Sequence, residues 1–304
     1  MAASKAAYSS VSLFHEKLLR SNRILAICGA GLSAASGLPT FRGAGGLWRN
    51  HNAVELATPE AFEADPGLVW LFYAYRRHMA LEANPNPAHY ALAELARKKP
   101  GFRCLTQNVD NLHVRAQHPS EQLSLLHGSL FALKCSNAPG CKWTDPYNTA
   151  DPLCPALAPA AEKNTDPTKP LPLLDPSKPL ADIKPDELPH CPECETGLVR
   201  PGVVWFGEPL DEGMLDEIDE WIEKEPVDMV LVIGTSSFVY PAAGYAERAR
   251  TEGRTAVVTV NLELGSAQGR NKIEEGDFGF EGDAAVLLPE LLKPVIGEVE
   301  APLE

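Results

Sequence analysis

The chain has 304 residues and a hydrophobic content of 44%, enough to bury a substantial core as one large domain with insertions or as two domains. No apolar run approaches the roughly 18 to 20 residues of a membrane-spanning helix, so the sequence predicts no membrane segment. The formal net charge of −14 disfavours nonspecific binding to nucleic acid and favours basic partners such as lysine-rich segments.

The N-terminal residues 1–31 lack the apolar core of a secretory signal peptide, because an amphipathic helix leads within a few residues into the first expected strand. We therefore expect reduced thiols, and the short N-terminus favours the cytoplasm or nucleus. Seven cysteines is an odd number, so closely spaced cysteines in this chain indicate a metal site before a disulfide.

The first expected strand, at 23–31, runs into the loop "GAGLSAASGLPTFRG" at 29–43. Gly29 and Gly31 allow a ligand to approach the backbone, and a following helix would present free N–H groups to a pyrophosphate. The loop departs from the dinucleotide fingerprint, because the third glycine is displaced to Gly37 and no acidic residue ends a second strand at the expected distance. A structural turn would explain the two glycines equally well, but it would not explain the "PTFRG" that follows.

Residues 50–100 look helical, and the stretch "WLFYAYRRHMA" at 70–80 carries two adjacent arginines, Arg76 and Arg77. Helical spacing predicts a core stripe formed by Leu68, Val69, Phe72, Tyr75 and Met79. On periodicity alone, both arginines would lie in solvent.

The second expected strand, at 102–110, ends in "QNVD". Gln107, Asn108 and Asp110 carry amide and carboxylate groups suited to ribose hydroxyls and a carboxamide, although they could equally cap the next helix. Further on, "LLHGSL" places His127 at an expected strand end, where it is available as a general base. A lone histidine is nevertheless more often structural.

Residues 134–200 bear cysteines and look irregular, with ten of the 27 prolines between 151 and 190. So much proline prevents regular structure and predicts a long surface excursion anchored at both ends. Two cysteine pairs flank it: Cys135 with Cys141, and Cys191 with Cys194. Four thiolates would complete a tetrahedral zinc site and leave no position for water, so we expect a structural metal that holds the excursion down. Cys154 is the nearest competing ligand, and Cys28 and Cys104 are expected as core thiols.

Two further apolar runs, at 228–237 and 255–263, complete a set of four that alternate with helical stretches such as 86–98 and 240–252. This pattern predicts a doubly wound α/β domain with a parallel sheet. Ligands in such sheets bind beyond the carboxyl ends of the strands, where the polar residues of this chain fall.

Taken in order, "GAGLSAASGLPTFRG", "TQNVD", "HGS", the cysteine pairs, "VVWFGE", "GTSS" and "VNLE" resemble the sirtuin family over roughly residues 20 to 290. The first cysteine pair is spaced by five residues where the family commonly has two, but a wider loop can still supply two thiolates. The resemblance implies an NAD-dependent removal of acyl groups from lysine that yields nicotinamide and O-acyl-ADP-ribose. It further implies a Rossmann-like NAD-binding domain from residues 1–49, 101–133 and 200–304, a helical acyl-pocket module at 50–100, and a zinc-binding module with the proline-rich excursion at 134–199.

The resemblance also assigns site residues, with His127 as the catalytic base. The residues expected to bind NAD are Gly29, Ala30, Gly31, Ser33, Ala34, Thr40, Phe41, Arg42, Trp48, Gln107, Asn108, Asp110, His127, Gly234, Thr235, Ser236, Asn261, Leu262, Glu263 and Ala284. The segment Val204, Trp205, Phe206, Gly207 and Glu208 would offer a strand edge to an extended acyl-lysine peptide.

Within the family, "FYAYRR" resembles the Y-x-x-R of class III sirtuins, the desuccinylase and demalonylase type, which maps to Tyr73 and Arg76. Residues i and i+3 share a helix face, so the two side chains could clasp a carboxylate at the end of an acyl chain. Ala57 resembles the small residue that widens the acyl pocket in this class, and Ala53 lies one turn before it. The resemblance thus implies succinyl, malonyl or glutaryl lysine as substrate, with Arg77 as a solvent-exposed or structural neighbour.

Other activities compete with this interpretation. A dehydrogenase would share the NAD fold but would not release nicotinamide, and a noncatalytic binding module would be expected to have lost His127 or Asn108. A general lysine deacetylase or a protein ADP-ribosyltransferase of the same fold is the alternative closest to the prediction. The sequence shows no exposed heptad or dimer strip, which predicts a monomer, and class III relatives leave the mitochondrion open as a location.

Overall fold

The computed structural model describes residues 10–40, 46–163, 171–235, 239–264 and 273–299. Within these ranges, six strands form a parallel sheet in the order β11-β10-β9-β1-β4-β5. The strands are β1 (Ile24–Cys28), β4 (Phe102–Thr106), β5 (Leu123–Leu125), β9 (Met229–Ile233), β10 (Ala256–Asn261) and β11 (Phe278–Glu281). The predicted doubly wound α/β class is confirmed.

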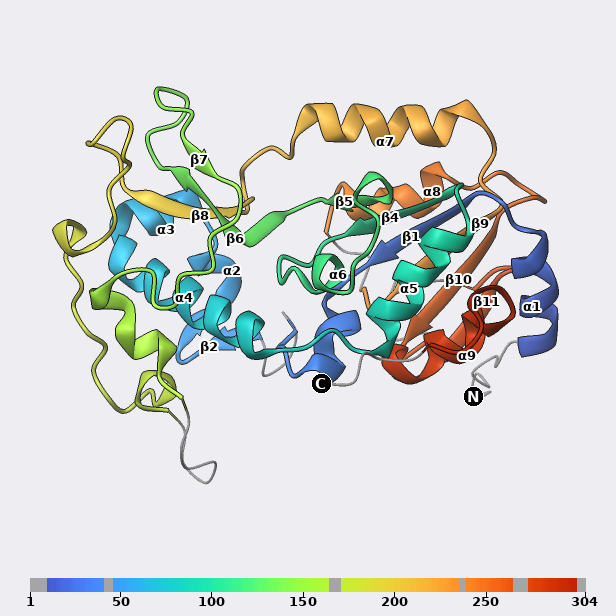
Figure 1. The fold of residues 1–304 in the computed structure, drawn as a ribbon, viewed down its shortest axis with the longest axis horizontal. Helices are drawn as coiled ribbons and strands as arrows, with labels where there is room; N and C mark the ends of the chain where they lie inside the picture. Colours follow the sequence, from blue (N-terminus) through green and yellow to red (C-terminus); the bar gives the residue numbers. More distant parts are fainter. Residues whose placement is uncertain (1–9, 41–45, 164–170, 236–238, 265–272, 300–304) are drawn as a thin grey trace, which may run out of the picture.

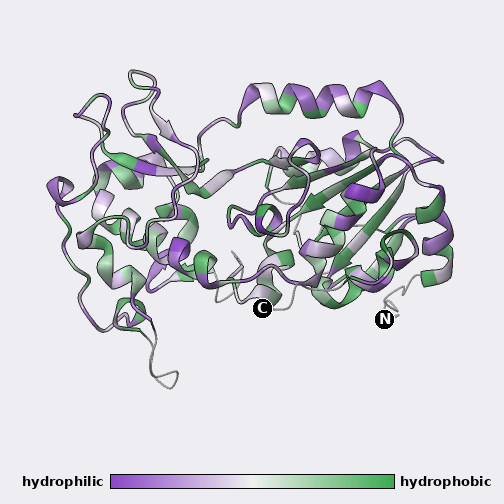
Figure 2. Cartoon of the chain, in the orientation of Figure 1, coloured by the Kyte–Doolittle hydropathy of each residue, from purple (hydrophilic) through white to green (hydrophobic). Residues whose placement is uncertain are grey.

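Helices cover both faces of this sheet (Figure 1). Alternate residues of β1 point to opposite faces of the sheet. On one face, Ala26 packs in a core with the helices α1 (Val11–Arg20), α5 (Pro87–Lys98) and α9 (Ala284–Ile296). On the other face, Ile27 packs in a core with the helix α7 (Glu212–Lys224). Burial on both sides explains the continuous apolar runs, and the strands of this sheet are mainly hydrophobic in Figure 2. The helix expected at 240–252 is shorter than predicted, because it consists of a 3-10 turn (η7, Ala242–Gly244) and one helical turn (α8, Tyr245–Arg248).

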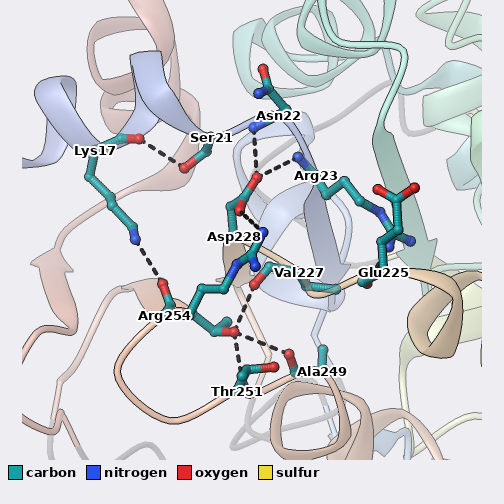
Figure 3. A network of polar contacts seen from close by, with 11 residues as sticks. Lys17, Ser21, Asn22, Arg23, Glu225, Val227, Asp228, Ala249, Thr251 and Arg254 are labelled. Atoms are coloured by element: carbon teal, nitrogen blue, oxygen red, sulfur yellow. Dashed lines mark hydrogen bonds and ion pairs between the residues drawn. The ribbon is translucent and has the colours of Figure 1, made fainter.

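A polar network fixes the amino-terminal edge of the sheet, where β1 and β9 begin (Figure 3). The carboxylate of Asp228 accepts hydrogen bonds from the backbone amides of Asn22 and Arg23, at 2.9 and 3.0 Å, and the ammonium of Lys17 donates to the carbonyl of Arg254 at 2.8 Å. Burial opposes ionisation of Asp228, but the two amides hold its pKa below the usual range. This edge is therefore tied together, while the loops at the opposite edge remain available for a ligand.

A second body of structure lies beside the sheet, at the left of Figure 1. An antiparallel sheet in the order β7-β6-β8 consists of β6 (Gly128–Cys135), β7 (Thr144–Asp145) and β8 (Val199–Val203). It packs with α2 (Ala53–Leu56), α3 (Pro59–Ala64) and α4 (Pro66–Glu82), and the short strands β2 (Leu47–Trp48) and β3 (His51–Asn52) precede these helices. A pair of tryptophans, Trp70 and Trp205, is buried in this second core.

The segment expected as one helical module, residues 50–100, divides between the two cores. Helices α2 to α4 contribute to the second core, whereas Ala88, Leu92 and Leu95 of α5 pack into the sheet core against α9. The helix α5 begins with a capping box at Asn86, directly before Pro87. We therefore propose the boundary between the helical module and the sheet domain near residues 83–86.

The proline-rich excursion is packed more deeply than a surface loop. Its 3-10 turns η4 (Pro155–Ala161), η5 (Pro172–Leu174) and η6 (Pro185–Glu187) each begin at a proline. The second core contains buried side chains from this segment, namely Leu157, Ala160, Leu173, Ile183 and Leu188. A Cβ at Gly67 of α4 would lie 2.5 Å from the carbonyl oxygen of Ile183, so the excursion also approaches α4 at backbone contact. Its own packing thus holds it in place, in addition to any metal.

Across the described ranges, no helix combines the length and apolar character needed to span a bilayer.

Candidate functional site

The loops that follow β1, β4, β9 and β10 meet at the carboxyl edge of the parallel sheet. The amide of Gly31 donates to the carbonyl of Gly234 at 2.9 Å, and the amide of Gly234 donates to the carbonyl of Val260 at 3.0 Å. A Cβ at Gly31 would lie 2.8 Å from the Cα of Gly234, and one at Gly29 would lie 2.6 Å from the Cβ of Thr235. Glycine is therefore required for these loops to pack against one another, a structural role that acts together with ligand approach.

The loop after β1 forms a 3-10 helix, η1 (Ala30–Ser36), that ends at Gly37 in the left-handed region. Ser33 is buried in it, and its hydroxyl donates to Asp110 Oδ2 at 2.6 Å. Asn108 Nδ2 donates both to Ser33 Oγ and to the carbonyl of Gly29, each at 3.1 Å. The network joins the loops after β1 and β4 into one rigid wall.

Asp110 has two roles in this wall. Its Oδ1 accepts from the amide of Leu112 at 2.9 Å, so Asp110 bonds into the first turn of the short helix α6 (Leu112–Arg115). Its Oδ2 holds Ser33. The hydrogen bond to Leu112 confirms the contact with the next helix for this residue, and its role toward ribose stays a prediction.

His127 lies just before β6, half-buried beside the loop after β4. Its Nδ1 is 3.1 Å from the carbonyl oxygen of Gln107, and Gln107 Nε2 donates to Thr235 Oγ1 at 3.0 Å. A carbonyl can only accept, so Nδ1 carries the proton and Nε2 is left as the basic nitrogen. Burial lowers the pKa of His127, although the Gln107 carbonyl opposes that shift. The lowered pKa favours the neutral ring, which is able to accept a proton.

A cavity of about 440 Å³ lies between the loop after β1 and the helix α4. Its wall includes Thr40 and Trp48, which were expected to bind NAD, and Arg76, which was expected to bind an acyl carboxylate. A second cavity of about 30 Å³ lies at the other end of the loop. Predicted cofactor residues that line one or the other are Gly31, Ala34, Thr40, Trp48, Gly234, Asn261, Leu262 and Ala284.

Other predicted cofactor residues lie around these cavities without lining them in the described part of the chain. Ala30 and Thr235 belong to the loops just described, and Glu263 is exposed after β10. Phe41, Arg42 and Ser236 lie outside the described residues.

The two arginines of α4 have different environments. Arg76 is half-buried in the wall of the larger cavity, with its guanidinium 5.5 Å from the centroid of the Phe72 ring. Arg77 is only 1% exposed, so of the two alternatives predicted for it the solvent position is wrong and the structural one is confirmed. Its guanidinium donates to the carbonyls of Leu130, Asn148 and Ala150 and thereby ties α4 to β6 and to the chain after β7.

The expected core stripe of α4 is likewise divided. Val69 is fully buried, but Phe72, Tyr75 and Met79 contribute to the wall of the larger cavity. The face of α4 that carries Arg76 therefore lines the cavity and also packs against the core.

Tyr73 of α4 is fully buried among aromatic rings. Its ring lies 4.9 Å from that of Phe72 and 6.2 Å from that of Trp205, between ring centroids. Within the described residues, neither its hydroxyl nor Trp205 Nε1 makes a hydrogen bond of ordinary geometry. Burial raises the pKa of Tyr73 to about 12, and the nearby charge of Arg76 opposes that rise. Two unpartnered buried donors therefore meet beside Arg76, although Tyr73 is not part of the cavity wall defined by the described residues.

The segment after β8 is held by backbone and ionic contacts. Val204 donates its amide to the carbonyl of His127, and Phe206 donates its amide to the carbonyl of Ala57, both at 2.9 Å. Glu208 accepts from both terminal nitrogens of Arg200, at 2.6 and 2.9 Å, and from the amide of Trp205 at 2.9 Å. Phe206 and Gly207 are exposed. The predicted peptide strand edge is thus joined directly to the candidate base and to the small residue expected in the acyl pocket.

The four predicted zinc ligands converge. The Sγ atoms of Cys135, Cys141, Cys191 and Cys194 all lie within 4.8 Å of one another. The Cys135–Cys194 and Cys141–Cys191 sulfur distances are 3.6 and 3.7 Å, close to the edge of about 3.8 Å expected for tetrahedral thiolates around zinc. A Cβ at Gly197 would lie 2.6 Å from Cys135 Sγ, so this position must stay small. The donor set fits zinc, and Cys154 lies apart, with its thiol toward the carbonyl of Glu187.

A second group of buried ligand-type atoms, from Cys28, Cys104 and His113, also lies within 4.8 Å. The two sulfurs are 3.8 Å apart in adjacent strands, and the hydrogen bond with the Cys104 thiol, together with burial, raises the pKa of Cys28. Cys28 and Cys104 are fully buried core thiols, as predicted.

The sequence missed several residues of the larger cavity, namely Arg49, Tyr75, Met79 and Leu174. Arg49 follows Trp48 directly and could have been suspected from that position. Leu174 lies in the irregular proline-rich segment, where no periodicity or motif could have assigned it to the cavity.

Known proteins resemble this chain in sequence and in fold. A model of the Sir2 family matches residues 29–241. The chain is 44% identical to an NAD-dependent protein deacylase of Candida albicans, over 94% of this chain and 98% of the relative. It is 42% identical to the mitochondrial NAD-dependent protein deacylase sirtuin-5 of Canis lupus familiaris, over 94% of this chain and 86% of the relative. The crystal structure of a Sir2 homologue in complex with NAD aligns with a TM-score of 0.73 at 32% identity, covering 96% of each chain. The chain therefore belongs to the Sir2 family.

Proposed function

We propose that this Sir2-family protein is an NAD-dependent protein-lysine deacylase that prefers acidic acyl groups such as succinyl, malonyl and glutaryl. The observation that carries the acidic preference is the position of Arg76, in a cavity wall shared with Thr40 and Trp48 of the candidate NAD region. Relatives named as NAD-dependent protein deacylases, sirtuin-5 among them, support the reaction.

NAD fits the carboxyl edge of the sheet. The loops that carry Gly31, Gly234 and Asn261 would hold the adenosine half. The wall formed by Ser33, Asn108 and Asp110 would orient the ribose and carboxamide at the other end. Bound NAD would supply an electrophilic ribose carbon and nicotinamide as the leaving group, so that the acyl group departs as O-acyl-ADP-ribose.

His127 would act as the general base. Its Nδ1–H is fixed on the Gln107 carbonyl, which aims the ring and leaves Nε2 to take a proton from a ribose hydroxyl. The hydrogen bond from the Val204 amide to the His127 carbonyl supports a peptide-binding strand edge next to this base. An acyl-lysine on that strand would reach the pocket past Ala57 and Trp205.

Arg76 would select the acyl group. Burial lowers the pKa of its guanidinium, and Tyr73 and Asp110 oppose the shift, but an arginine remains charged at neutral pH. A carboxylate at the end of the acyl chain would form charge-assisted hydrogen bonds worth roughly a few kcal/mol, and an acetyl group offers none. The unpartnered hydroxyl of Tyr73 would be satisfied by the same carboxylate after a modest side-chain movement.

Zinc would be structural. The four thiolates would complete its coordination, so it would hold the loop that bears Cys135 and Cys141 against the one that bears Cys191 and Cys194, and it would take no part in acyl transfer.

The test of this proposal is product analysis. The protein, NAD and a succinyl-lysine peptide should yield nicotinamide, unmodified peptide and succinyl-ADP-ribose in equal amounts, and His127→Ala should abolish all three. Transfer of ADP-ribose to the protein or peptide, without loss of the acyl group, would instead support an ADP-ribosyltransferase.

A further inference from the structure

We propose that residues 171–178 of the proline-rich excursion form a wall of the acyl pocket and limit the length of the acyl chain that it accepts. This inference rests on the proposed deacylase function. Leu174 carries it, because its side chain lines the same cavity as Arg76, although nearly one hundred residues separate them in sequence.

The excursion is anchored immediately beside Leu174. Leu173 is 6% exposed and belongs to the core formed by α4 and the antiparallel sheet. Leu173 therefore anchors the segment in the core, and Leu174, which is partly buried against the same core, also lines the cavity. Because Leu173 cannot move without opening the core, the position of Leu174 in the cavity wall is fixed.

Arg49 binds the segment directly through its guanidinium. Its Nη1 donates to the carbonyl of Leu173 at 2.7 Å, and its Nη2 donates to the carbonyl of Lys178. One guanidinium therefore bridges both ends of the turn, and Arg49 itself lines the cavity. Arginine is suited to this, since its planar fork presents two donors in fixed geometry.

The turn between these two carbonyls is closed by its own hydrogen bonds. Asp175 Oδ1 accepts from the amide of Ser177 at 3.0 Å and from its hydroxyl at 2.6 Å, and the amide of Lys178 donates to the carbonyl of Asp175 at 3.1 Å. Segment 171–178 is therefore a preformed turn attached at Leu173 and Arg49.

This arrangement predicts a limit on chain length. A carboxylate bound to Arg76 lies in the cavity that Leu174 bounds, so each added methylene brings the acyl chain closer to an apolar wall. In such a pocket one methylene changes kcat/KM by roughly 10- to 200-fold. Removing the Leu174 side chain should admit longer dicarboxylic acyl groups, and enlarging it should exclude them.

The experiment measures kcat/KM for one peptide carrying dicarboxylic acyl groups of three to eight carbons on the same lysine. Leu174→Ala should raise kcat/KM for the longest acyl groups by about tenfold relative to succinyl, and Leu174→Phe should lower it. Arg49→Ala should flatten the profile in the same direction as Leu174→Ala, because it releases the turn.

Matched controls come from the same excursion. Leu180→Ala removes a leucine that packs against the core without lining the cavity, and Lys178→Ala keeps the backbone carbonyl that Arg49 binds. Both should retain the wild-type profile. Identical profiles for Leu174→Ala, Leu174→Phe and Leu180→Ala, at unchanged melting temperature, would overturn the inference while leaving the deacylase function intact. Absence of turnover with every acyl group in the wild type would overturn both.

Discussion

The buried arginine of α4 gives a prediction that separates structure from catalysis. Arg77→Met keeps most of the aliphatic volume of the side chain but removes the donors that reach the carbonyls of Leu130, Asn148 and Ala150. Those carbonyls lie on β6 and on the chain after β7, and α4 is held to both through this one guanidinium. The substitution should therefore loosen the contact between the helical module and the antiparallel sheet.

The magnitude follows from the lost contacts. A hydrogen bond from a charged donor contributes about 1.5–3 kcal/mol, and acceptors left without a partner in a buried site add to the loss. Since Met retains some packing against Phe131, we expect Arg77→Met to lower the free energy of unfolding by about 3–5 kcal/mol. In a chain of this size, that corresponds to a fall in melting temperature of roughly 6–10 °C.

The assay is thermal unfolding followed by circular dichroism, with Arg76→Met as the matched control. Arg76 lines a cavity, so its substitution should change the melting temperature by only about 1–2 °C, as is usual away from buried networks. Equal melting temperatures for wild type and Arg77→Met would refute the structural role that we assign to Arg77.

Further predictions concern pH and metal. Because burial lowers the pKa of His127, the acid limb of kcat/KM should lie below the ordinary histidine value of about 6.5; a limb above that value would count against His127 as base. Burial, with His113 nearby, also lowers the pKa of His89, so the unfolded state takes up a proton first, and the free energy of unfolding should fall as pH drops below about 6.5. His89→Gln should reduce this dependence of the free energy of unfolding on pH, measured by denaturant titrations at several pH values. An unchanged pH dependence would mean that a group other than His89 causes it. Cys191→Ser should lower both the zinc content, from one ion per chain, and the melting temperature, whereas Cys154→Ser should change neither; equal zinc content in the two variants would contradict the predicted ligand set.

The parallel sheet was predictable because its strands are buried on both faces. The strands β1 and β9 are continuous apolar runs, β4 and β10 are mostly apolar, and the polar residues after all four mark one edge of the sheet. The zinc ligands were predictable for a similar reason, since paired cysteines in a reduced chain carry their own spacing signal.

The sequence could not predict the environment of side chains whose partners lie far away along the chain. Helical periodicity treats Arg76 and Arg77 as equivalent neighbours, and only the carbonyls of Leu130 and Asn148 distinguish the buried one from the cavity residue. The burial of Leu157 and Leu173 was hidden because 3-10 turns that start at proline show neither a period of 3.6 nor a period of 2.

The prediction of a monomer stays a prediction, and light scattering would check it: the 32.9 kDa mass supports it, and twice that mass would contradict it.

The most direct test of the central claim offers one peptide, acetylated in one sample and succinylated in the other, to wild type and to Arg76→Met in the presence of NAD. Nicotinamide release and peptide mass are followed together. We expect the wild type to prefer the succinyl peptide and Arg76→Met to lose that preference by on the order of a hundredfold, because the guanidinium would be the partner of the acyl carboxylate. Equal removal of acetyl and succinyl by the wild type would contradict the acidic preference and identify a general deacetylase.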